Sequence, residues 1–107
     1  MCNAALTRAF GFLGKRWNGV LLGTLMEGPL GFAELKRAVA GISDSMLSER
    51  LAELSAAALV ERDVEPGPPV SVRYRLSESG SALLPALTAL TTWAQENLPA
   101  ACAADAD

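Results

Sequence analysis

The chain of 107 residues is the size of a single domain, and a composition half hydrophobic and one-fifth charged is typical of a globular protein. Nine basic against twelve acidic residues give a formal charge of −3, which argues against strong nucleic-acid binding driven by charge alone. The chain has no histidine, and its two cysteines, Cys2 and Cys102, form neither a CxxC pair nor a zinc pattern. We therefore expect no enzyme, no metal and no cofactor.

The apolar runs are too short to span a bilayer, and the N-terminal residues lack the basic start and long apolar run of a signal peptide. A cytoplasmic protein without membrane contact is the expectation. The basic residues all lie at or before Arg75, whereas Glu96, Asp105 and Asp107 lie near the C-terminal end. This separation of charge is compatible with a nucleic-acid-binding face whose affinity depends only weakly on salt.

Helical spacing of apolar residues predicts a first helix over 4–13 and a second from about Trp17 to Leu25, which ends at Glu27-Gly28-Pro29. The Trp17 indole is expected to anchor the core. A third helix is predicted from about Phe32 to Val39, followed by Gly41 at a left-handed turn position.

A fourth helix is predicted to begin at a cap formed by Ser43 or Asp44. One of its faces carries apolar residues that should be buried, namely Leu47, Leu51, Leu54 and Ala58. The opposite face carries Ser45, Ser48, Glu49 and Ala52. This second face is short and polar, which suits close approach to base edges in DNA.

Two β-like runs, 59–64 and 70–76, flank a Pro/Gly-rich turn and predict a two-stranded hairpin. Val70, Val72, Tyr74 and Leu76 should share one face of it. Ser77 is expected to cap a last helix over 78–98, kinked by Pro85 near 81–84. The apolar stripe of that helix is wider than so small a domain needs, which indicates coverage by a second copy of the chain.

The order of elements is that of a winged helix-turn-helix, a mainly α fold with a two-stranded wing and terminal dimerisation helices. The detailed pattern resembles the HxlR-type family of bacterial transcription regulators, which are related in fold to MarR-type repressors. The residues that carry the resemblance extend from Cys2 to about Asn97 and include Gly14-Lys15-Arg16-Trp17, Gly28-Pro29-x-x-Phe32-x-Glu34-Leu35, Gly41-Ile42-Ser43, Met46-Leu47-Ser48-x-Arg50-Leu51-x-x-Leu54, Leu59-Val60-x-Arg62, Pro68-Pro69-Val70-x-Val72-x-Tyr74-x-Leu76-Ser77, Gly80, Leu83-Leu84-Pro85 and Trp93.

The resemblance implies a homodimer on a near-palindromic operator of double-stranded DNA, with half-sites about one helical turn, ~34 Å, apart. It implies dimerisation through the first and last helices. It also implies an oxidant or electrophile as effector, because several family members sense such compounds through a cysteine at the place of Cys2. A disulfide between Cys2 and Cys102 of the partner is our hypothesis for the switch.

Four positions depart from the family pattern. Gly31 and Ser45 stand where relatives often carry arginine, and Ala58 stands where glycine is usual before the wing. Arg73 adds a positive charge where an acidic residue is common. Because an early arginine is missing from the recognition helix, we expect DNA to be read partly through its shape and phosphates.

The resulting organisation is one domain over 1–99, with the helix-turn-helix at 31–57, the wing at 59–76, dimerisation helices at 4–13 and 78–98, and a flexible acidic tail at 100–107. The candidate DNA-binding residues are Lys36, Ser43, Ser45, Ser48, Glu49, Arg50, Arg62, Arg73 and Arg75. Glu49 would either accept from a cytosine amino group or pair with Arg50. The candidate redox residues are Cys2 and Cys102, and the candidate dimer residues are Leu6, Phe10, Leu87, Leu90 and Trp93.

Two alternatives remain open. The same fold would serve a sensor of a small apolar ligand, bound at the dimer interface near Phe10, Trp17 and Trp93. A winged helix used for protein interaction is the other alternative, and the acidic net charge favours it.

Overall fold

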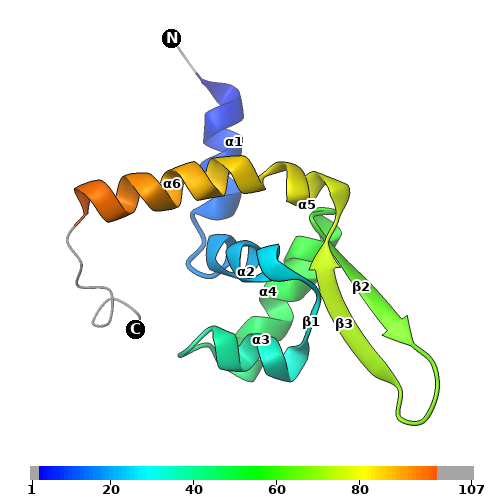
Figure 1. The fold of residues 1–107 in the computed structure, drawn as a ribbon. Coiled ribbons are helices and arrows are strands. Elements are labelled where there is room, and N and C mark those ends of the chain that lie inside the picture. Colours follow the sequence, from blue (N-terminus) through cyan, green and yellow to red (C-terminus); the bar gives the residue numbers. More distant parts are fainter. Residues whose placement is uncertain (1–2, 99–107) are drawn as a thin grey trace.

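The computed structural model describes residues 3–98. Two helices come first, α1 (Ala4–Leu13) and α2 (Asn18–Thr24), and a 3-10 turn, η1 (Leu25–Glu27), extends the second. Strand β1 (Leu30–Gly31) leads into the helix pair α3 (Phe32–Ala38) and α4 (Asp44–Ala56), which strands β2 (Val60–Glu65) and β3 (Ser71–Leu76) follow. Helices α5 (Glu78–Ala82) and α6 (Leu84–Asn97) complete the order, and α1, α6 and the β2–β3 hairpin project from the central body (Figure 1).

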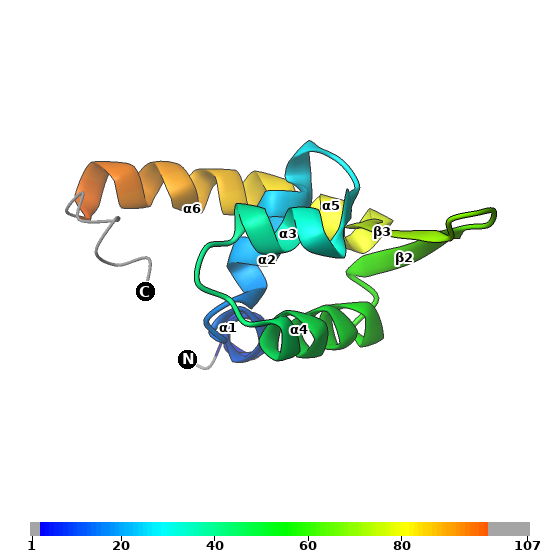
Figure 2. The same cartoon turned by 90° about the horizontal axis from the view of Figure 1, so that it is seen from below.

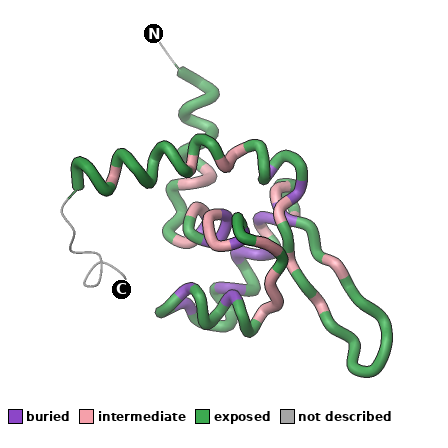
Figure 3. Tube along the Cα trace, in the orientation of Figure 1, coloured by how far each residue is buried: buried purple, intermediate pink, exposed green. Residues whose placement is uncertain are grey.

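The hydrophobic core lies where α2, α3 and α4 meet, and the buried segments in Figure 3 gather there. Its fully or almost fully buried leucines are Leu21, Leu22, Leu35, Leu47, Leu51 and Leu54. Each such side chain stabilises the fold by roughly 1.5–3 kcal/mol relative to exposure. The predicted apolar face of the fourth helix is therefore confirmed for its three leucines. Trp17 is half-buried and packs at the edge of this core.

Ala58 does not lie on the buried face of α4, contrary to the prediction. The helix ends at Ala56, and Ala58 is exposed with a φ of 63°, in the left-handed region. This conformation lets the Leu59 N–H donate to the Leu54 carbonyl at 3.0 Å, which satisfies a free carbonyl at the helix end. Glycine adopts this conformation without strain, and alanine does so at a cost of about 1–2 kcal/mol.

The sheet has three antiparallel strands in the order β1-β3-β2, rather than the two that were predicted. The strand missed by the prediction, β1, pairs Leu30 with Tyr74, and two residues are too few to show an alternating pattern. Strand β2 pairs with β3 from Val60 opposite Leu76 to Glu65 opposite Ser71. Val70 precedes β3 and is exposed, so it does not share the half-buried face of Val72, Tyr74 and Leu76 that the prediction gave it.

The predicted last helix is two helices that meet at Leu83. The Ser77 hydroxyl caps α5 by accepting from the Gly80 N–H at 3.1 Å, as expected of this serine. Pro85 is the second residue of α6, a position where its missing N–H costs no helical hydrogen bond, so the proline starts a new helix instead of kinking an old one. Gly80 lies against the wing, since a Cβ built there would fall 2.2 Å from the Leu59 carbonyl oxygen.

Helices α1 and α6 contain no buried residue. Four of their large apolar side chains expose about half of their surface, Leu6 at 51%, Phe10 at 56%, Leu90 at 49% and Trp93 at 52%. Phe12, Leu13 and Leu87 are less exposed, because they pack against the core. Among the helices of residues 3–98, none has both the length and the apolar character needed to traverse a membrane.

Candidate nucleic-acid interface

The exposed face of α4 is formed by small polar side chains at its N-terminal end. The Ser43 hydroxyl accepts from the Met46 N–H at 3.1 Å and so caps the helix, as predicted. Ser45, Ser48 and Glu49 are all exposed. The structure thus brings the predicted serines and Glu49 together on one face that no bulky side chain covers, and Figure 2 shows α4 along the edge of the molecule.

Arg50 does not lie on this face. The residue is 9% exposed, and its guanidinium contacts Glu53 at 2.5 Å and Glu49 at 3.8 Å. Arg50 and Glu53 are three residues apart on one helix, a spacing that brings their side chains together. As a candidate phosphate contact, Arg50 is therefore separated from the other predicted residues.

Three other predicted DNA-binding cations already have acidic partners. Lys36 pairs with Asp44 at 2.5 Å, and Arg73 lies 3.9 Å from Glu34 and donates to the Pro29 carbonyl at 3.1 Å. Arg75 contacts Glu61 at 2.5 Å and Asp63 at 2.6 Å. The Asp63 carboxylate, with a smaller contribution from Glu61, raises the pKa of Arg75 above its usual value.

The wing presents its arginines on two faces. Arg62 lies opposite Tyr74 in the β2–β3 ladder, whereas Arg73 and Arg75 lie opposite Asp63 and Glu61. Directly opposed residues share a face of the sheet, and neighbours along a strand alternate. Arg62 therefore points away from the other two wing arginines.

Two exposed cations of the helix-turn-helix and wing have no ion pair with residues 3–98, namely Arg37 and Arg62. Arg62 was among the predicted contacts and Arg37 was not. The sequence feature that could have identified Arg37 as a candidate DNA contact is its position on the outer side of the third predicted helix. Lys36, its neighbour, is instead paired with Asp44.

The predicted redox residues, Cys2 and Cys102, lie outside the described residues. Within the described part, no group of three or more His, Cys, Asp or Glu side chains is arranged to hold a metal ion.

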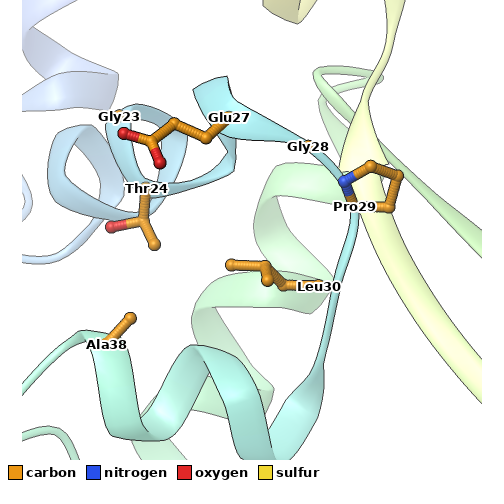
Figure 4. Close-up of a pocket in the computed structure, with 7 residues that line it drawn as sticks. All are labelled: Gly23, Thr24, Glu27, Gly28, Pro29, Leu30 and Ala38. Carbon is orange, nitrogen blue, oxygen red and sulfur yellow. The ribbon is translucent and has the colours of Figure 1, made fainter.

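An open pocket of about 480 Å³ lies between α2, η1, β1 and α3 (Figure 4). The side chains of Thr24, Glu27, Leu30 and Ala38 line it, together with Gly23, Gly28 and Pro29. None of the aromatic residues considered for a ligand at the dimer interface contributes to this pocket.

Comparison with known proteins agrees with this geometry. Residues 12–102 match the model of the HxlR-like helix-turn-helix family. The HTH-type transcriptional regulator YodB of Bacillus subtilis is 46% identical over 88 residues, which cover 82% of this chain and 79% of that protein. YvaP of the same organism, described as an uncharacterised HTH-type transcriptional regulator, is 39% identical over 89 residues, covering 83% of this chain and 82% of that protein.

Solved structures lead to the same family. The reduced form of B. subtilis YodB superposes with a TM-score of 0.82 at 42% identity, over 92% of this chain and 96% of that one. The redox regulator HypR in its oxidised form gives a TM-score of 0.83 at 29% identity, over 89% and 98%. The winged-helix fold predicted from the sequence is confirmed, and the chain belongs to the HxlR-like helix-turn-helix family of transcriptional regulators.

Proposed function

We propose that the protein is a homodimeric repressor that binds a near-palindromic operator through α4. In this proposal Ser43, Ser45, Ser48 and Glu49 face the base edges in the major groove, and the recognition helices of the two copies lie about 34 Å apart. The observation that carries the proposal is the capped, exposed and uncrowded serine face of α4 in a chain of this family.

Phosphate contacts would come first from the two cations of the helix-turn-helix and wing that have no acidic partner among residues 3–98, Arg37 and Arg62. Lys36, Arg73 and Arg75 would contribute only after phosphate oxygens replace the carboxylates that hold them now. Few free cations and a net charge of −3 support modest affinity with a weak salt dependence.

Dimerisation would use α1 and α6, as expected for residues 4–13 and 78–98. Leu6, Phe10, Leu90 and Trp93 expose about half of their surface in the single chain. Exposed aromatic and aliphatic side chains on two helices without any buried residue support a second copy as the cover, with Leu87 at its edge.

Control by thiol chemistry at Cys2 completes the proposal. The relatives support it: HypR is described as a redox regulator, and YodB has been solved in reduced, diamide-treated and quinone-bound forms. In the proposed switch, the thiols of Cys2 and the partner copy's Cys102 give two electrons and two protons to diamide and form one disulfide. An electrophile such as a quinone would instead alkylate Cys2. The protein would act in the cytoplasm, and we propose no catalytic role.

A gel shift with the DNA upstream of the protein's own gene tests DNA binding. A shift that diamide abolishes in the wild type, but not in Cys2→Ser, supports the proposal. If a quinone still releases the double variant Cys2→Ser/Cys102→Ser from DNA, the thiols are not the sensor, and the alternative of a ligand site at the dimer interface is favoured. If no duplex is shifted at low salt, the winged helix serves protein interaction instead.

A further inference from the structure

A cluster of four polar residues connects the N-terminal helix to the recognition helix. The Glu53 carboxylate of α4 accepts from three donors: Lys15 Nζ at 2.6 Å, Asn18 Nδ2 at 3.1 Å and Arg50 Nη1 at 2.5 Å. Lys15 lies between α1 and α2, and Asn18 begins α2. We call Lys15, Asn18, Arg50 and Glu53 the Glu53 cluster. The cluster joins residues far apart in the sequence, since Lys15 and Glu53 are 38 positions apart.

The cluster continues into α1 through Asn18. This side chain is 0% exposed, and its Nδ2 also donates to the Phe12 carbonyl at 3.0 Å, in the last turn of α1. One amide group therefore joins the end of α1 to the Glu53 side chain of α4.

Stability alone does not account for these polar groups. Asn18 Oδ1 and Arg50 Nε are buried without a hydrogen-bond partner among the described residues, and such groups cost free energy. Well-packed apolar residues in their place are often neutral or stabilising. Polar groups retained at this cost are expected to specify a geometry.

The position of Glu53 on α4 indicates which geometry is specified. Leu47, Leu51 and Leu54 attach one side of the helix to the core, and the serine face points the opposite way. At 100° per residue, Glu53 falls on the flank between these two faces. The hydrophobic effect that buries the leucines is not directional, whereas the hydrogen bonds from Lys15 and Asn18 to Glu53 are directional and join α4 to the chain outside it. The Arg50–Glu53 contact lies within α4 and orients the Glu53 side chain.

We propose that Glu53 is a positioning residue for DNA recognition, which fixes the orientation of α4 relative to α1 through Asn18 and Lys15. The inference rests on the proposed function, in which α4 reads DNA and α1 joins the dimer. The angle at which each α4 meets the groove, and the half-site spacing that the dimer accepts, are then set at the Glu53 cluster. The Lys15 hydrogen bond lowers the pKa of Glu53 and so favours the ionised carboxylate, the form that accepts all three hydrogen bonds.

The first test measures geometry without DNA. Spin labels replace Arg8 on α1 and Ser48 on α4 in a Cys2→Ser/Cys102→Ser background, and excess unlabelled protein leaves only the distance within one chain to be measured. Glu53→Gln should broaden or shift this distance distribution. Lys15→Met should do so in part, and Lys15→Arg should restore it. Glu27→Gln is the control, because it removes the same charge from an exposed residue remote from the cluster.

The second test measures recognition. The wild type selects its preferred duplex from a library with a randomised core about two helical turns long. Glu53→Gln should bind that duplex about tenfold more weakly than Glu27→Gln does, the effect of about one lost base contact, while the two variants bind random duplex within about twofold of each other. Glu53→Gln should also relax the preference for half-site spacing.

An unchanged distance distribution in Glu53→Gln and Lys15→Met overturns the proposal. So does equal weakening on both duplexes together with a lower melting temperature, which would make Glu53 merely structural. If Glu53→Gln does not fold, the two Lys15 variants decide. If the wild type selects no duplex, the proposed function fails, whereas the distance measurement still decides whether Glu53 positions α4.

Discussion

The acidic partners of Arg75 give a quantitative expectation for DNA binding. In the double variant Glu61→Gln/Asp63→Asn, the guanidinium loses both carboxylates that now lie 2.5 and 2.6 Å away. The carboxylates that raise the pKa of Arg75 are then gone, but Arg75 remains charged because an arginine side chain stays protonated far above neutral pH. Each copy then offers one more free cation to the phosphate backbone, and a dimer offers two.

The magnitude follows from counterion release. Each neutralised phosphate contributes about 0.9 to the slope of log K against log salt, so two more phosphates should steepen the slope by about 1.8. A fourfold rise in salt would then weaken the variant's binding about twelvefold more than it weakens wild-type binding. The variant should also bind random duplex more tightly than the wild type at low salt.

Fluorescence anisotropy of a labelled duplex, titrated at several NaCl concentrations, measures this slope. The control is Glu65→Gln/Glu78→Gln, which removes the same two negative charges from exposed residues that have no ion pair within residues 3–98. If Glu61→Gln/Asp63→Asn and the control have the same slope of log K against log salt, the carboxylates do not prevent Arg75 from contacting DNA.

Three further outcomes are expected. Phe10→Ala/Trp93→Ala should weaken the dimer about 100-fold or more in analytical ultracentrifugation, and unchanged dimerisation would exclude α1 and α6 as the interface. Ala58→Gly should raise the free energy of unfolding by about 0.5–1 kcal/mol in urea, because glycine relieves the positive φ; a loss would contradict the strain. The pKa of Glu53 is lowered, chiefly by the Lys15 hydrogen bond, so the stability from this pairing is present above the unfolded-state pKa and disappears as pH falls through the folded-state value. Lys15→Met should therefore destabilise the protein in urea at about pH 7 but not at about pH 2, and an equal loss at both would exclude the ion pair as its cause.

Sequence patterning predicted the elements of this fold wherever local chemistry decides them. The leucine spacing of α4, the Ser43 and Ser77 caps and the left-handed Gly41 follow from neighbouring residues alone. The two-residue strand β1 does not, because it forms only where β3 is present to pair with it. The left-handed conformation of Ala58 was not predicted for a similar reason. The chain must turn between the end of α4 at Ala56 and the start of β2 at Val60, and the direction of that turn depends on the position of the sheet.

The DNA face was harder to predict than the fold. A basic residue that is free to contact DNA and one that is paired with carboxylates look the same in sequence, so Arg62 and Arg75 were both predicted to bind DNA. The partners of Arg75 come from the adjacent strand, and those of Arg50 from its own helix. The role of Asn18 could not be predicted, because a lone asparagine at the start of a helix usually indicates a cap rather than a buried hydrogen bond to a distant element.

A change of backbone angle at Leu83, where α5 ends and α6 begins, would move α6 as a lever arm. Its 14 residues make a rod about 21 Å long at 1.5 Å per residue. A rotation of about ten degrees about Leu83 moves the far end of such a rod by about 3.7 Å. If a second copy holds that end in place, the same rotation would instead move the wing and α4. The reason is that Gly80 of α5 packs against the Leu59 carbonyl at the start of the wing, so that α5 and the wing move together. The point of bending, Leu83, would thus precede Pro85, and the end of α6 held by the second copy would follow it.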